Sequence, residues 1–272
     1  MTTAGTVTID FAAATLRHSN LGGAGPDASR DAPPTMLWEG VASTAAGRVD
    51  LQVSNLTASR LTALDHTGRR GFGQIALSAP TKHSATDLAL VELRFSFLHA
   101  DGSPATLEKT YISFYDLDTS YTATVRECIA ATGATDAATP VTSTLRPIEP
   151  DAPPLATTAF AQRAEAEQRP FHAVCGSEAG RGDDNPTDPT QLHDVARSRA
   201  IMLTYEHVSS FEVLFAIQRL VPPDECCSLR RAQRTHAAAA RGRARSHRTH
   251  AATARTPPLR SHRAHTATTR SV

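Results

Sequence analysis

The chain has 272 residues, and its 28 Lys and Arg residues nearly balance 27 Asp and Glu residues, for a formal net charge of +1. The charges are unevenly distributed along the chain, because residues 229–272 hold 11 Arg, 5 His and no acidic residue. The remainder therefore carries 17 basic and 27 acidic residues, together with all 14 aromatic residues. We predict one folded acidic domain, residues 1–227. We also predict a disordered tail, residues 228–272, which has too few apolar side chains to offset its ordering entropy.

These properties also exclude some classes of protein. No stretch of about 18 apolar residues is present, so no membrane-spanning helix is expected. The first 16 residues lack the basic and apolar regions of a secretory signal, which predicts a cytoplasmic protein. If a signal precedes this sequence in the full gene, an extracellular or cell-surface location is expected instead. Nucleic acid is not the expected partner, because the Arg-rich tail has no aromatic residue and no nucleic-acid-binding signature accompanies it.

Most of the domain shows the alternation of apolar and polar residues that is typical of half-buried strands. Short strands are predicted, in chain order, at 5–11, 36–43, 49–53, 72–78, 87–98, 109–117, 121–128, 141–147, 170–175, 199–205 and 210–218. A short helix is predicted at 158–168, within a long connection. About ten short strands separated by Gly, Pro and Asp residues favour an all-β fold, namely an antiparallel β-sandwich or jelly roll.

The strongest pattern is at 87–98, where Val91, Leu93, Phe95 and Phe97 share one face. The following His-Ala-Asp-Gly-Ser-Pro segment is rich in turn residues, and Asp-Gly supplies the positive φ that a hairpin needs. Alternation resumes at 109–117. We therefore predict that 87–98 and 109–117 pair as a long β-hairpin.

The four cysteines are Cys128, Cys175, Cys226 and Cys227, and none forms a Cys-x-x-Cys pair. A zinc site of the usual spacing is therefore not expected. In an oxidising compartment Cys128 and Cys175 can pair. The alternative is that they are buried free thiols, which is a common state of cysteine.

Two acidic segments are candidates for a metal site. Asp116 and Asp118 follow the hairpin and, in an extended segment, would point to the same side. A later loop holds three Asp residues and one Asn within six positions, and calcium takes six to eight oxygen ligands from such loops. The predicted ligands are Asp116, Asp118, Asp183, Asp184, Asn185 and Asp188. The alternatives are a strand-capping turn for the first segment and an exposed polar loop for the second.

Enzyme signatures do not emerge from the sequence. The motifs Gly-x-Ser-x-Gly, His-Glu-x-x-His and the phosphate-binding loop are absent. A pair of carboxylates of the glycosidase kind is a property of three-dimensional structure, so that possibility stays open.

Three segments resemble a β-sandwich domain family found in uncharacterised proteins of marine algae and other protists. They are Gly71-Phe72-Gly73-Gln74-Ile75, the strand at 91–97 (Val-Glu-Leu-Arg-Phe-Ser-Phe), and 111–118 (Tyr-Ile-Ser-Phe-Tyr-Asp-Leu-Asp). Residues 183–189 and Phe211–Phe215 complete the resemblance. The resemblance covers about residues 5–220 and excludes the tail. It implies the sandwich fold and the two acidic segments as family features, and it implies no activity.

Together these observations predict a non-enzymatic binding or adhesion module, stabilised by calcium, whose partner is a glycan or another cell-surface ligand. The alternatives are a carbohydrate-active hydrolase that uses paired Asp carboxylates and a purely structural surface protein. The step from sandwich to binding module is an analogy at the level of the fold. The sequence leaves the oligomeric state open.

Overall fold

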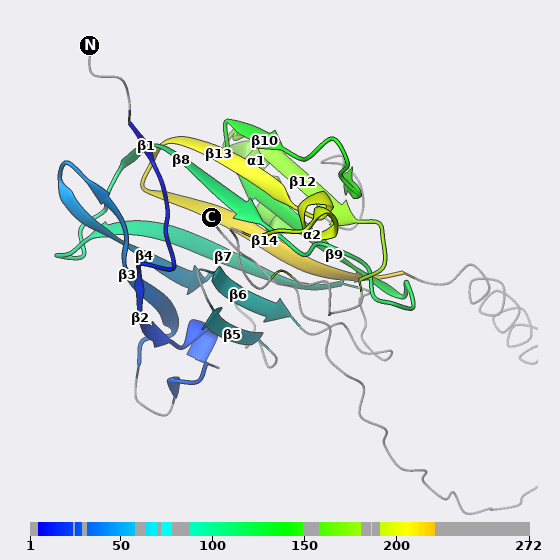
Figure 1. The fold of residues 1–272 in the computed structure, drawn as a ribbon, viewed down its shortest axis with the longest axis horizontal. Helices are drawn as coiled ribbons and strands as arrows, with labels where there is room; N and C mark the ends of the chain where they lie inside the picture. Colours follow the sequence, from blue (N-terminus) through cyan, green and yellow to red (C-terminus); the bar gives the residue numbers. More distant parts are fainter. Residues whose placement is uncertain are drawn as a thin grey trace, which may run out of the picture.

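The structure is a computed structural model, and it describes residues 5–23, 25–28, 32–57, 64–69, 72–77, 88–148, 158–180, 186 and 191–220. Two sheets pack face to face as an all-β sandwich, which confirms the predicted fold class (Figure 1). The predicted tail, 228–272, lies outside the described residues. No helix in the described part of the chain is long and apolar enough to cross a membrane.

The larger sheet has eight strands in the order β11-β12-β9-β14-β7-β4-β3-β2, and every pair in it is antiparallel. Its strands are β2 (Thr15–Ser19), β3 (Thr35–Thr44), β4 (Gly47–Asn55), β7 (Leu88–His99), β9 (Val125–Thr132), β11 (Leu145–Pro147), β12 (Phe171–Gly176) and β14 (Ser210–Arg219). A short 3-10 helix, η1 (Leu21–Gly23), follows β2.

The smaller sheet has the order β1-β8-β13-β10. It consists of β1 (Thr6–Val7), β8 (Leu107–Phe114), β10 (Asp136–Ala138) and β13 (Ile201–Val208). The strands β5 (Leu64–Arg69) and β6 (Phe72–Leu77) form a separate two-stranded sheet.

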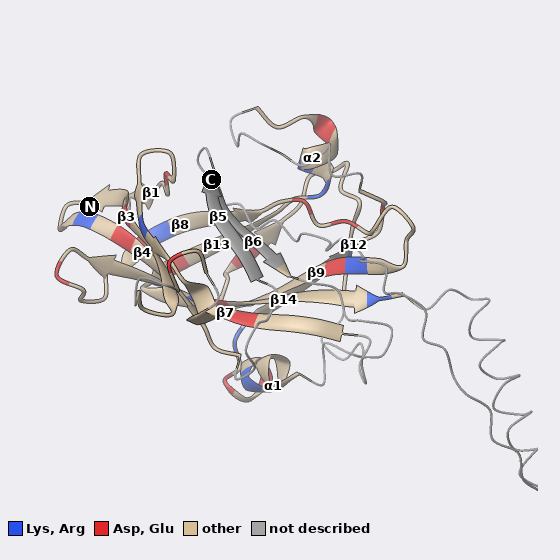
Figure 2. Ribbon diagram, turned by 90° about the horizontal axis from the view of Figure 1, so that it is seen from below, with Lys and Arg blue, Asp and Glu red and all other residues tan. Residues whose placement is uncertain are grey.

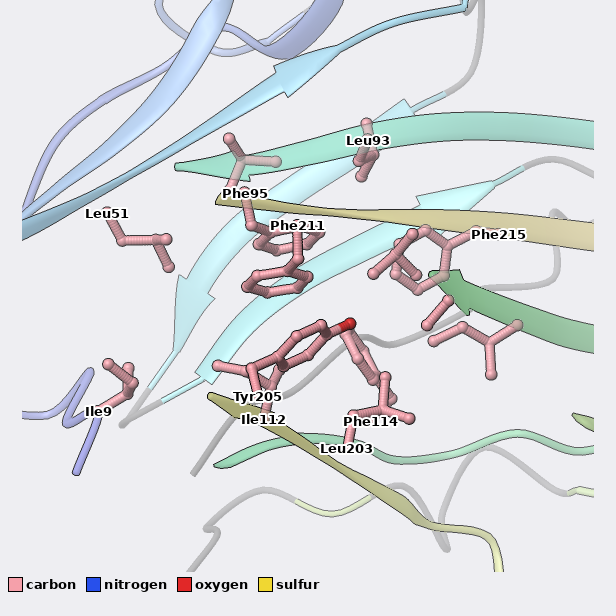
Figure 3. Packing of buried hydrophobic residues seen from close by; sticks show 14 of the residues in the cluster. Ile9, Leu51, Leu93, Phe95, Ile112, Phe114, Leu203, Tyr205, Phe211 and Phe215 are labelled. Carbon is pink, nitrogen blue, oxygen red and sulfur yellow. The ribbon is translucent and has the colours of Figure 1, made fainter. Parts of the chain in front are cut away.

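Aromatic side chains join the two sheets. Tyr205 of β13 stacks on Phe211 of β14 with ring centroids 4.4 Å apart. Phe114 of β8 lies edge-on against Phe215, at 5.7 Å, and near Phe95, at 6.3 Å (Figure 3). These five rings are at most 6% exposed. Burying aromatic rings removes a large apolar area from water, so this contact is a principal reason why the two sheets stay together.

A second apolar cluster lies on the outer face of the larger sheet. The helix α1 (Ala159–Ala166) confirms the predicted helix, and Thr158 caps it by accepting a hydrogen bond from the Ala161 backbone N–H. Its Phe160 packs with residues of β9, β12 and β14, including Leu214. Figure 2 shows α1 beside the strands of the larger sheet. At its edge Arg163 forms ion pairs with Glu92 and Glu212.

The predicted hairpin of 87–98 with 109–117 is wrong. The turn forms as expected, with Gly102 at φ 84°. The His99 N–H donates to the Ser103 carbonyl, and the Gly102 N–H donates to the His99 carbonyl. After Ala105, however, the chain crosses to the other sheet. There β8 pairs with β13 and β1, while β7 pairs with β14 and β4. The alternating pattern indicates correctly which face is buried, but it contains no information about the partner strand.

Candidate functional site

Several connections meet at one end of the sandwich, which we call the loop end. It comprises residues 115–124, 139–144, the described parts of 177–200, and Leu220. The register explains why they meet: β9 begins beside the ends of β12 and β14, and β13 begins beside the end of β8. Both predicted acidic segments belong to connections at this end.

The first acidic segment is not extended. The strand β8 ends at Phe114, before the predicted limit at 117, and Asp116 has a left-handed backbone with φ 65°. The alternation that would point Asp116 and Asp118 to the same side therefore does not apply. Asp116 is 3% exposed, which is uncommon for an aspartate.

Backbone hydrogen bonds hold this segment between two others. The Thr119 N–H donates to the Glu178 carbonyl, and the Gly180 N–H donates to the Thr119 carbonyl, both at 2.8 Å. The Asp118 carbonyl accepts from the Glu127 N–H, also at 2.8 Å. The segment is therefore fixed against the start of β9 and against 178–180.

Glycines make this close approach possible. A Cβ added to Gly176 would lie 2.6 Å from the Asp118 backbone nitrogen and carbon. A Cβ added to Gly180 would overlap the Asp118 carboxylate. Both positions therefore require glycine for a steric reason, since neither has a positive φ.

A buried arginine partly compensates the acidic groups. The Arg199 side chain is 5% exposed, and its Nη1 lies 3.3 Å from Asp118 Oδ2. Its Nη2 donates to the Ala179 carbonyl at 2.9 Å. The Arg199 carbonyl also accepts from the Leu117 N–H. This one residue therefore connects the segment after β8 with the segment after β12.

Glu127 is the third carboxylate of the group. It is 4% exposed, and its Oε2 has no hydrogen-bond partner among the described residues. Burial raises the pKa of Glu127 well above its usual value, and the nearby charges of Asp118 and Asp116 raise it further. The Glu127 carboxyl therefore favours its neutral, protonated form.

Among the described residues, three carboxyl groups lie close enough for their charges to interact: the charges of Asp118 and Asp116 raise the pKa of Glu127, and the charge of Arg199 lowers it. Like charges are costly to bring together in a medium of low dielectric constant. Either a proton on Glu127 or a bound cation can reduce this cost.

The structure places the predicted metal ligands unequally. Asp116 and Asp118 lie at the loop end, whereas Asp183, Asp184, Asn185 and Asp188 lie outside the described residues. Within the described ranges no group of three or more His, Cys, Asp or Glu side chains has the geometry to hold a metal ion. The described carboxylates therefore do not form a complete metal site by themselves.

The sequence prediction missed Glu127 and Arg199. Glu127 lies two residues from Val125 and from Ile129, so the three side chains share one face of β9, and the two apolar residues are buried. A glutamate on the inward face of a strand is a signal that can be recognised from sequence. Arg199 precedes β13 in a polar stretch, and no such signal distinguishes it.

A disulfide links two strands next to this site. Cys128 of β9 and Cys175 of β12 are directly paired in register and are bonded, with their Cα atoms 4.0 Å apart. Of the two states left open by the sequence, the structure has the bonded one. The bond connects the strand that carries Glu127 to the strand that ends at Gly176 and leads to Gly180.

No family model and no curated protein matches the chain. Among solved structures, the N-terminal domain of an adhesin from Streptococcus gordonii is similar, with a TM-score of 0.35 and 8% identity. The match covers 70% of this chain and 49% of that one, so this chain spans about half the length of that structure. A likeness at this level does not extend to function. The resemblance to algal and protist proteins stays a prediction.

Proposed function

We propose that the chain is a non-enzymatic binding or adhesion module whose loop end is stabilised by calcium. The observation that supports this proposal is the grouping of three carboxyl groups, those of Asp116, Asp118 and Glu127, in one region of the domain beside Arg199. A divalent cation offsets such charge, and calcium accepts carboxylate, amide and backbone oxygens in flexible geometries.

The second acidic segment supplies the remaining ligands in this proposal. Gly180 is held against Asp118 and Thr119, and Asp183 follows three residues later. An extended chain spans at most about 3.6 Å per residue, and only a short stretch of sequence separates Asp183 from Gly180. The proposed ligands are drawn from Asp116, Asp118, Asp183, Asp184, Asn185 and Asp188, and we add Glu127 because its carboxyl group lies near those of Asp118 and Asp116.

The proposed partner is a glycan or another ligand of the cell surface, and the proposed location is extracellular. The disulfide supports this location, because disulfides persist in oxidising compartments. The loop end suits a binding role, since rigid sandwiches commonly carry their ligand sites on connections at one end. This last step is an argument from fold class.

Thermal unfolding in calcium and in chelator tests the calcium proposal. A ligand present at 100 times its Kd stabilises the folded state by about 2.7 kcal/mol. For a domain of this size, about 1 kcal/mol shifts the midpoint by about 2–4 °C. We therefore expect a rise of about 5–11 °C in saturating calcium relative to EGTA.

Two variants sharpen the test. The D183N/D184N double variant should lose most of the calcium shift, while the E206Q variant, altered at an exposed site on β13, should keep it. Equal midpoints of the wild-type protein in calcium and in EGTA would remove the calcium proposal.

Among the described carboxylates, the geometry of Asp116 and Asp118 does not suit the alternative of a hydrolase with paired Asp carboxylates. A glycosidase needs both carboxyl groups beside the scissile bond of a bound sugar. Asp116 is buried, and Asp118 is engaged by Arg199. A purely structural surface protein would show neither a calcium shift nor ligand binding.

A further inference from the structure

Exposed apolar side chains concentrate at the loop end. Four large hydrophobic side chains are exposed in the described part of the chain: Tyr121, Val141, Val195 and Met202. The first three lie on loop-end connections. Tyr121 is the only aromatic residue among them, and it is 72% exposed. Isolated exposed apolar residues need no explanation, but an exposed aromatic ring offers a large flat apolar surface with a polar end to a ligand.

Tyr121 is presented by a firmly held turn. Ser120 Oγ accepts hydrogen bonds from the backbone N–H groups of Thr124 and Val125, at 3.0 and 3.2 Å. The Ser120 backbone completes the turn by donating to the Val125 carbonyl and accepting from the Ala123 N–H. Ala123 has a left-handed backbone with φ 50°, a strained conformation that is typical of functional turns. The orientation of the turn is therefore determined before any ligand binds.

Three hydroxyl side chains belong to the same turn as Tyr121. Thr122 Oγ1 and Thr124 Oγ1 are 2.9 Å apart, and Ser120 Oγ lies 3.2 Å from Thr124 Oγ1. Thr122 and Thr124 are exposed. Each hydroxyl can donate one hydrogen bond and accept two. The turn thus combines one exposed aromatic ring with adjustable donors and acceptors.

The turn also adjoins the proposed calcium segment. Thr119, two residues before Tyr121, forms a parallel bridge with Ala179 and hydrogen bonds with Glu178 and Gly180. Acidic groups, hydroxyls and an aromatic ring therefore lie along the same short stretch of chain, which is a suitable setting for a polar ligand with some apolar faces.

We propose that the turn 120–124 is a sugar-binding subsite in which a pyranose ring packs on Tyr121. This inference rests on the proposed binding function and names its contact surface. The C–H face of a sugar covers the aromatic ring, and the sugar hydroxyls exchange hydrogen bonds with Thr122 and Thr124. Because the turn is ordered before the ligand binds, less conformational entropy is lost on binding. A glycan fits better than an apolar peptide, because the nearest side chains on this turn carry hydroxyl groups.

A glycan array followed by titration of the best methyl glycoside, in calcium, tests this subsite. The Y121A variant should weaken binding about tenfold, which corresponds to about 1.4 kcal/mol. Y121F keeps the ring and should stay within about threefold of the wild-type affinity. V141A alters an exposed apolar residue on a neighbouring connection and should leave the affinity unchanged. All variants should retain the calcium-dependent midpoint of the wild-type protein.

Two results would overturn the inference. Equal affinity of Y121A and the wild-type protein would place the sugar elsewhere and leave the binding module intact. Absence of any glycan ligand, while calcium still raises the midpoint, would remove the sugar subsite but not the calcium proposal. Loss of the calcium shift alone would contradict the calcium proposal and not the role of Tyr121.

Discussion

The disulfide between Cys128 and Cys175 should be a main source of stability. Replacing both residues with alanine in C128A/C175A opens a loop defined by a sequence separation of 47. In the chain-entropy treatment, a crosslink over about 47 residues stabilises the folded state by about 4 kcal/mol at 25 °C. For a domain of this size, the midpoint should fall by about 8–16 °C.

Urea unfolding with and without dithiothreitol measures this effect. The wild-type protein should lose about 4 kcal/mol when the reductant is present during unfolding. The C128A/C175A variant should be insensitive to the reductant. The matched control C226A/C227A retains the crosslink and should respond as the wild-type protein does. A wild-type loss below about 1 kcal/mol would refute the loop-entropy argument, and mass spectrometry without a linked Cys128–Cys175 peptide would refute the crosslink itself.

Three further predictions concern buried polar groups and close packing. Because the folded state raises the pKa of Glu127, it binds that proton more tightly than the unfolded chain. The free energy of unfolding in EGTA should then fall as pH rises above about 4.5 and level off above the raised pKa. In urea titrations between pH 4 and 9, the E127Q variant should show a flatter dependence of this free energy on pH. An unchanged slope would contradict the raised pKa of Glu127. G176A should destabilise the domain by about 1–3 kcal/mol in urea, because its Cβ would collide with the Asp118 backbone, and a neutral result would contradict the close approach. Y205F should leave the free energy of unfolding unchanged or raise it by up to about 1 kcal/mol, because the buried Tyr205 hydroxyl has no partner among the described residues. Calorimetry measures this change, and a marked loss of stability would show that the hydroxyl is hydrogen-bonded.

The sequence predicts the local elements well where alternation is strong. In β7 the residues Val91, Leu93, Phe95 and Phe97 are all buried, as their spacing indicates. The helix at 158–168 also forms, at Ala159–Ala166. Both patterns express burial against a neighbouring layer, which depends on residue spacing within one element.

The partners of the strands could not be predicted in the same way. The turn after β7 is correct, yet β8 joins the other sheet. The apolar face of β8 would be buried between the sheets whether β8 belonged to the sheet of β7 or to the opposite sheet. The alternating pattern is therefore compatible with both strand arrangements. Only the packing of Phe114 between Phe95 and Phe215 shows which arrangement the chain adopts.

The candidate site was only partly accessible from sequence for the same reason. Composition alone separates an acidic body from a basic tail, and local spacing marks Asp116 and Asp118 as unusual. The left-handed backbone at Asp116, the ion pair of Asp118 with Arg199 and the burial of Glu127 depend on contacts between segments about 10 to 80 residues apart. Charge and periodicity are properties of the chain itself, whereas desolvation and ion pairing exist only once distant segments meet, so only the tertiary structure could decide them.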